Sequence, residues 1–114
     1  RVRSSAASDV YKRQAKEYIR QHYAESDLSV EKLCAYLHLS STYFSTLFKR
    51  ETGTSFTAYV TTVRMEAAAE AIRGTEEKTY LIAQRCGYED PNYFSYVFKR
   101  HFGVTPTKYR SEGK

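Results

Sequence analysis

Hydrophobic side chains recur every three or four positions along most of this chain, which is the pattern of amphipathic helices packed around a core. Near the N-terminus the pattern predicts one helix over residues 15–24 and a second over residues 30–37, which begins behind the N-cap Ser29. After a short turn, Ser40 caps a third helix that ends before Gly53. A helix, a tight turn and a second capped helix form a helix-turn-helix.

The same order of elements is expected in the second half of the chain. The predicted helices there cover residues 56–73, 79–86, 91–102 and 105–110. Thr79 is the expected cap of one of them, and Asp90 with Pro91 opens the next, because proline at a first helical position loses no needed hydrogen bond. Seven helices without a strand signal predict an all-α fold of two helix-turn-helix subdomains joined by a long connector helix.

These elements divide the chain into segments. We expect a first helix-turn-helix subdomain over residues 15–53, the connector over 54–74, a second subdomain over 75–111 and a tail over 112–114. The stretch RVRSSAASDVYKRQ is small and polar and shows no helical periodicity, so residues 1–14 are predicted to be a disordered lead-in. It also resembles translated adaptor or vector sequence, so no functional residue is expected in it.

A segment of the first helix-turn-helix recurs in the second at a distance of 50 residues. The pattern YFSxxFKRxxG occupies residues 43–53 and again residues 93–103. The match extends to a threonine and a tyrosine beyond each segment, Thr57 with Tyr59 and Thr107 with Tyr109. A small protein that builds one helical unit twice presents two similar surfaces, which suits a periodic ligand such as duplex DNA.

The apolar letters of the repeat lie on one helix face and are predicted to be core. They are Phe44, Leu47 and Phe48 in the first copy and Phe94, Val97 and Phe98 in the second. The opposite face carries short polar side chains, which leave a helix narrow enough to enter a major groove about 12 Å wide. Those positions hold Thr42, Ser45, Thr46 and Lys49 in the first copy and Asn92, Ser95, Tyr96 and Lys99 in the second.

The net charge of +5 suits a nucleic-acid partner, but its distribution adds little to that argument. Four basic residues and one acidic residue give residues 1–14 a net charge of +3, which leaves +2 for the remaining hundred. Cations near the helix ends, such as Arg50 and Arg100, are favoured by helix dipoles in any protein. Phosphate contacts are therefore expected mainly from backbone N–H groups at helix starts. The predicted phosphate-contacting residues are Ser29, Ser40, Ser41, Arg64, Thr79 and Lys99.

The pattern GYEDPNYFSxxFKRxFGxxPxxYR, over residues 87–110, resembles the DNA-binding domain of the AraC/XylS family of bacterial transcription regulators. The resemblance extends over residues 15–110 and includes Arg64 in the connector. It implies two recognition helices, over residues 41–52 and 91–101, that enter successive major grooves on one face of the duplex, about 34 Å apart.

The resemblance also implies which positions contact bases and which partners are expected. The implied base-contacting residues are Thr42, Ser45, Thr46, Lys49, Pro91, Asn92, Ser95 and Tyr96. Because Thr42 and Thr46 of the first copy are replaced by Asn92 and Tyr96 in the second, we expect an asymmetric, non-palindromic site. Besides double-stranded DNA, the implied partners are RNA polymerase and an N-terminal sensor or receiver domain. The residues LHLS at 37–40 look closest to members with a receiver domain.

Other function classes have less support in the sequence. Cys34 and Cys86 lie in apolar helical patterns, as buried thiols of a reducing compartment do, and no segment is apolar enough for a membrane span, so a soluble cytoplasmic protein is expected. Metal-ligand spacings, phosphate loops and nucleophile motifs are missing, so neither an enzyme activity nor a cofactor is expected. Two alternatives stay open: a helical protein-interaction module, and a DNA-targeting appendage of a larger enzyme.

Overall fold

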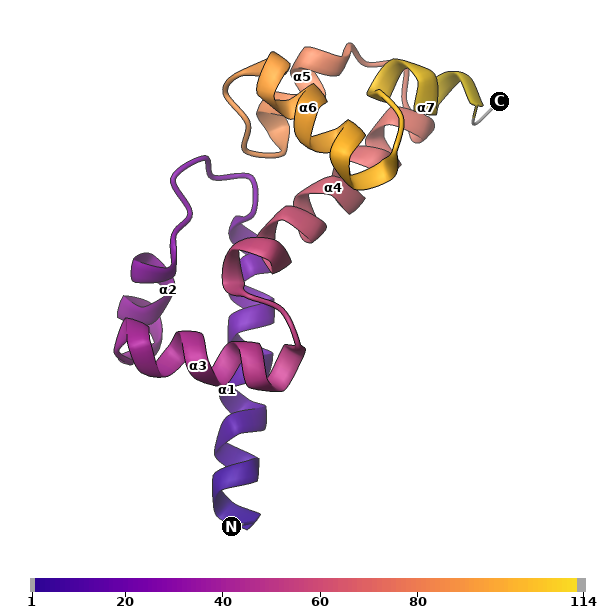
Figure 1. The fold of residues 1–114 in the computed structure, drawn as a ribbon. Coiled ribbons are helices and arrows are strands. Elements are labelled where there is room, and N and C mark those ends of the chain that lie inside the picture. The colour runs from indigo at the N-terminus through magenta and orange to yellow at the C-terminus, as the bar shows by residue number, and fades with distance from the viewer. Residues whose placement is uncertain (1, 113–114) are drawn as a thin grey trace. The chain divides into compact units, whose positions relative to one another are not determined.

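The computed structural model describes residues 2–112, with side chains from Asp9 onward, and these residues form seven α-helices and no strand (Figure 1). The all-α prediction is thus confirmed. The helices are α1 (Val2–His22), α2 (Val30–Leu37), α3 (Ser41–Thr52), α4 (Phe56–Gly74), α5 (Thr79–Arg85), α6 (Pro91–Phe102) and α7 (Pro106–Glu112). They form two compact units: one holds the chain up to His22 with Asp27–Thr61, and the other holds Tyr23–Ser26 and the residues from Thr62 onward.

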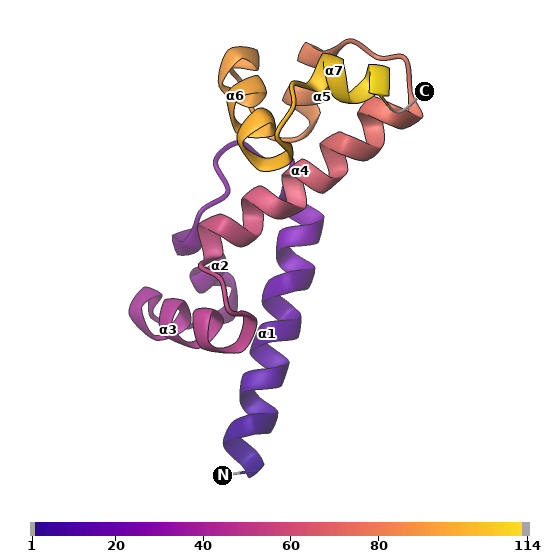
Figure 2. The same cartoon turned by 45° about the vertical axis from the view of Figure 1, so that its right-hand side comes forward.

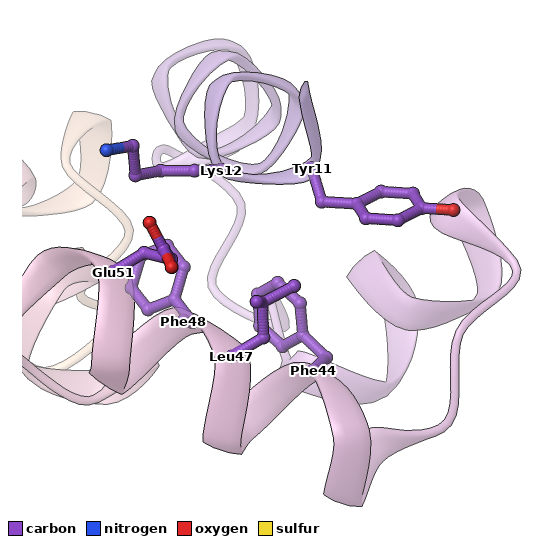
Figure 3. A pocket seen from close by; sticks show the side chains of 6 residues that line it. All are labelled: Tyr11, Lys12, Phe44, Leu47, Phe48 and Glu51. Atoms are coloured by element: carbon purple, nitrogen blue, oxygen red, sulfur yellow. The ribbon is translucent and has the colours of Figure 1, made fainter. Parts of the chain in front are cut away.

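The first helix is longer than predicted. It begins at Val2, so the expectation of a disordered lead-in over residues 1–14 is wrong for residues 2–14. This segment lacks an apolar stripe, but it also lacks glycine and proline, and its alanines and long polar side chains favour a helix. Tyr11 and Lys12 line a small apolar gap together with side chains of α3 (Figure 3).

The first unit packs α2 and α3 against α1. The α3 helix crosses α1 in the view of Figure 1 and lies beside it in that of Figure 2. Ile19 of α1, Leu33 of α2 and Phe44 of α3 are fully buried where these helices meet. The predicted caps are present: the backbone N–H of Lys32 donates to Ser29 Oγ at 3.2 Å, and the N–H of Tyr43 donates to Ser40 Oγ at 3.1 Å. These bonds fix where both helices of the first helix-turn-helix begin.

The second unit packs α5, α6 and α7 around the later part of α4. Its core contains the fully buried side chains Met65, Ile82, Phe94 and Phe98. Asp90 caps α6 as predicted, because its carboxylate accepts the backbone N–H of Asn92 at 2.9 Å.

The predicted cap of α5 is wrong. Thr79 is the first residue of that helix, and Lys78 occupies the N-cap position without a side-chain capping bond. The predicted cap is therefore displaced by one residue from the observed N-cap, which is the usual uncertainty of a helix end.

The structure shows what the repeated letters do. Phe48 packs edge-on against Tyr59 with ring centroids 5.4 Å apart, and Phe98 packs in the same way against Tyr109 at 5.3 Å. A cation lies over each tyrosine: Lys16 Nζ is 5.9 Å from the Tyr59 ring, and the guanidinium of Arg73 is 3.8 Å from the Tyr109 ring. The matching letters therefore maintain the same packing in both units.

Two arginines bind backbone carbonyls in the last turn of a long helix or just after it. Arg64 of α4 donates from Nε to the carbonyl of Tyr23 and from Nη2 to that of Glu25, both at 2.8 Å. Arg110 of α7 donates from Nε to the carbonyl of Ile72 at 2.7 Å and from Nη2 to that of Glu77 at 2.8 Å. Helix ends leave carbonyls without an intrahelical partner, and these side chains supply the missing donors.

Gly87 allows the Arg64 contact to form. A Cβ at this position would lie 2.8 Å from the carbonyl oxygen of Tyr23 and 3.0 Å from Arg64 Cζ, and the φ angle of +94° is in the left-handed region. The Arg64 guanidinium also lies 5.3 Å from the Tyr88 ring, and Ser26 Oγ donates to Glu89 at 3.0 Å. The segment after α1 thus depends on the turn between α5 and α6.

We expect Gly87→Ala to destabilise the domain more than Gly53→Ala does. Both glycines have a positive φ, so each alanine pays about 1–2 kcal/mol for the left-handed conformation, but only at position 87 does the new Cβ also collide with backbone. Urea-induced unfolding followed by circular dichroism measures both losses. Equal losses at the two positions would contradict the close approach of Gly87 to Tyr23.

Candidate nucleic-acid interface

The second helix of the first helix-turn-helix presents a short polar face to solvent. Phe44, Leu47 and Phe48 are buried on one side of α3, at most 3% exposed. The four predicted base-contacting positions on the other side are all exposed: Thr42, Ser45, Thr46 and Lys49. The burial of the apolar face thus determines which face of α3 remains available to a ligand.

The second helix of the second unit is arranged similarly but carries larger side chains. Phe94 and Phe98 are fully buried beneath α6. Of the predicted contact residues, Pro91, Asn92, Tyr96 and Lys99 are exposed and Ser95 is half-buried. The four predicted base-contacting residues of α3 therefore lie on the helix face opposite its buried phenylalanines, and those of α6 lie in its first two turns.

The α6 face has a contact that the sequence analysis missed. Arg100 Nη1 donates to the hydroxyl oxygen of Tyr96 at 3.0 Å. The two residues are four positions apart on a helix, so this spacing is the signal that could have revealed the pair. In α3, Thr46 occupies the position that corresponds to Tyr96. Arg50, which corresponds to Arg100, forms an ion pair with Glu51 instead, with 3.5 Å between Arg50 Nε and Glu51 Oε2.

The predicted phosphate-contacting residues lie on several elements. The hydroxyls of Ser29 and Ser40 serve as N-caps, Ser41 and Lys99 are exposed, and Thr79 is half-buried. A capping hydroxyl satisfies one backbone N–H of the first turn and leaves others directed along the helix axis. These positions stay predictions.

Arg64 occupies a different environment from the one expected. It is half-buried, and two of its nitrogens already donate to the carbonyls of Tyr23 and Glu25. The sequence contained no local signal for this, because the bonded residues are 41 and 39 positions away. The structure gives Arg64 a role in holding the backbone, and a phosphate contact stays a prediction.

Other chemistry is sparse in the part of the chain that the structure describes. Cys34 and Cys86 are free and buried, and burial raises the pKa of both thiols. No group of three or more His, Cys, Asp or Glu there could hold a metal ion, and none of the described helices is long and apolar enough to span a bilayer. A hydrogen bond from Lys32, 2.7 Å long, lowers the pKa of Asp27.

Comparison with known proteins agrees with this arrangement. The sequence model of a family described as a helix-turn-helix domain matches residues 33–112. The regulatory protein PocR of Salmonella typhimurium is 34% identical over 111 residues, which are 97% of this chain and 36% of PocR. The transcriptional activator RhaR of Mannheimia succiniciproducens is 33% identical over 108 residues, 95% of this chain and 39% of RhaR. The chain spans little more than a third of the length of these relatives.

Solved structures extend the comparison. The C-terminal domain of AraT, a response regulator from Geobacillus stearothermophilus, is 41% identical with a TM-score of 0.88, covering 90% of this chain and 84% of that one. The DNA-binding domain of AdpA, solved in complex with a target DNA, is 25% identical with a TM-score of 0.83, covering 89% and 90%. The chain therefore belongs to the AraC-type helix-turn-helix domains of bacterial transcription regulators.

Proposed function

We propose that this chain is the sequence-specific DNA-binding output domain of a bacterial transcription regulator, with α3 and α6 in successive major grooves of one duplex. One observation carries the proposal: the second helix of each helix-turn-helix exposes a polar face over a buried phenylalanine pair. The AdpA domain was solved with DNA, which supports the same use of the fold here.

Within this proposal, specificity comes from the positions at which the two copies differ. The proposed base-contacting residues are Thr42, Ser45, Thr46 and Lys49 in α3 and Pro91, Asn92, Ser95 and Tyr96 in α6. The amide of Asn92 can pair with adenine, whereas the α3 side chains suit methyl contacts and shape. The two half-sites then differ, and the preferred DNA site is non-palindromic.

The remaining contacts and partners belong to the same proposal. The proposed phosphate-contacting residues are Ser29, Ser40, Ser41, Arg64, Thr79 and Lys99. RNA polymerase is the expected protein partner, in the cytoplasm, and the domain itself has no catalytic role. An N-terminal receiver domain in the full-length protein is supported by two solved relatives that are C-terminal domains of response regulators, from AraT and from yesN of Fusobacterium nucleatum.

Selection from a random duplex pool tests the proposal directly. We expect a single asymmetric preferred site with two contact regions about one DNA turn apart. The logarithm of the association constant for that site should fall linearly with the logarithm of salt concentration, with a slope of about −0.9 per phosphate contact. If the domain binds no duplex even at low salt, it is a protein-interaction module instead, and pull-down of partner helices becomes the appropriate measurement.

Replacing Asn92 should relax specificity at one base pair. We expect Asn92→Ala to cost about 1–3 kcal/mol at that position, because a bidentate contact to adenine is lost, and to leave the other positions unchanged. Thr42→Ala, at the equivalent position of α3, is the matched control and should alter a position in the other half-site. Pool selection with both variants shows the change, and an equal loss of affinity for every sequence would exclude a base contact.

The role of Arg64 can be separated from that of Arg110. Both side chains bind two backbone carbonyls, so Arg64→Gln and Arg110→Gln should destabilise the domain similarly. If Arg64 also contacts phosphate, only Arg64→Gln should weaken binding to all sequences and reduce the salt slope by about one. Binding titrations are made at a temperature where circular dichroism shows both variants folded. An unchanged salt slope in Arg64→Gln limits that residue to a structural role.

A further inference from the structure

Tyr96 is the largest side chain at the predicted base-contacting positions, and its orientation is fixed from two sides. Its side chain is 57% exposed on α6. Arg100 Nη1 donates to its hydroxyl oxygen at 3.0 Å, one helical turn further along. On the N-terminal side the ring of Tyr93 lies with its centroid 6.2 Å away, tilted by 31°. A large exposed side chain would otherwise sample several rotamers.

We infer that Arg100 is a positioning residue that makes the Tyr96 hydroxyl a dedicated hydrogen-bond donor to one base of the target DNA. The inference deepens the proposed function, since it rests on α6 entering the major groove. Arg100 thereby gains a role that its counterpart in α3 lacks, because Arg50 has no tyrosine one helical turn away.

The direction of the hydrogen bond follows from the chemistry of the two groups. A guanidinium has five donors and no acceptor, so in this pair the phenol oxygen can only accept. Its single proton then remains for a partner outside the domain. A hydroxyl that accepts a bond from a cation is polarised and becomes a stronger donor.

This donor constrains which base can face Tyr96. In the major groove, guanine, adenine and thymine present acceptors at N7, O6 or O4, whereas cytosine presents its N4 amino donor. Cytosine on the contacted strand would leave two donors opposed without an acceptor between them. The expected readout is therefore the exclusion of cytosine at one position, rather than selection of a single base.

The fixed orientation also bears on affinity. A side chain that is already held in its binding orientation loses less conformational freedom when the complex forms. Tyr93, which is 55% exposed itself, limits the ring from one side while Arg100 holds the hydroxyl end. In α3 the small Thr46 takes the place of Tyr96, so the two half-sites should differ in kind: one depends on methyl contacts and shape, the other on a placed donor.

The test combines pool selection with direct titration of single duplexes that differ only at the Tyr96 position. The variants are Tyr96→Phe, Arg100→Met, Arg100→Lys and the Tyr96→Phe/Arg100→Met double variant, with Arg50→Met as the matched loss of a cation from the other copy. Tyr96→Phe and Arg100→Met should each reduce discrimination against cytosine about five- to tenfold, as for one hydrogen bond. The double variant should lose no more than either single one, because both changes remove the same contact.

Arg100→Lys should retain part of the discrimination, since an ammonium can still donate to the phenol oxygen. Arg50→Met should leave discrimination at this position intact. The inference is overturned if Arg100→Met weakens binding to all duplexes alike, because Arg100 then contacts phosphate. It is also overturned if the two single effects add in the double variant, because Arg100 then acts independently of Tyr96.

Failure of the proposed function has a different signature. A wild-type domain that selects no sequence would contradict DNA recognition as a whole. A wild-type domain that selects a clear site which Tyr96→Phe leaves unchanged would overturn only the assignment of Arg100 and Tyr96.

Discussion

Backbone carbonyls at helix ends are the constraint on which this fold depends. Tyr23 directly follows α1 and Ile72 lies in the last turn of α4, where carbonyls have no intrahelical donor. Arg64 and Arg110 provide those donors, each with two nitrogens of one planar guanidinium. Lysine could not replace them, because its single ammonium lacks the rigid fork that spans two carbonyls. Gly87 follows from the same constraint, since any Cβ there would collide with the Tyr23 carbonyl.

The 50-residue repeat separates scaffold from recognition. Its identical letters form equivalent packing contacts, such as Phe48 against Tyr59 and Phe98 against Tyr109. Buried side chains such as Phe48 and Phe98 must fit a close-packed core, whereas the exposed position held by Thr46 and Tyr96 is under no such requirement. Thr46 and Tyr96 illustrate the consequence: one register position holds a methyl and a small hydroxyl in α3 and a braced phenol in α6. One scaffold can thus carry two different contact surfaces.

Much of this fold could be predicted because its signals are local. Periodic apolar side chains and the caps Ser29, Ser40 and Asp90 locate α2, α3 and α6, and their capping bonds are present. The start of α1 could not be predicted, since a helix without an apolar stripe has no periodic signal. The bonds of Arg64 join residues about forty positions apart, and no local pattern encodes them. The exposed faces of α3 and α6 were predictable from the buried ones, and the contact between Arg100 and Tyr96 was signalled only by their spacing of four residues on one helix.

The cations of this domain fall into two groups, which are paired with carboxylates or bound to neutral oxygens, and the two groups contribute differently to the electrostatic potential. Arg85 pairs with Glu77 and Lys32 with Asp27, so these charges are cancelled locally. Arg64, Arg100 and Arg110 instead bind neutral oxygens, of carbonyls and of a phenol, and keep their full charge. A guanidinium held in this way is positioned without being neutralised, and it still contributes a positive potential toward a polyanion within a Debye length, about 8 Å in physiological salt. The cations that are bound to dipoles rather than to carboxylates can therefore attract DNA, even though the domain has few excess cations.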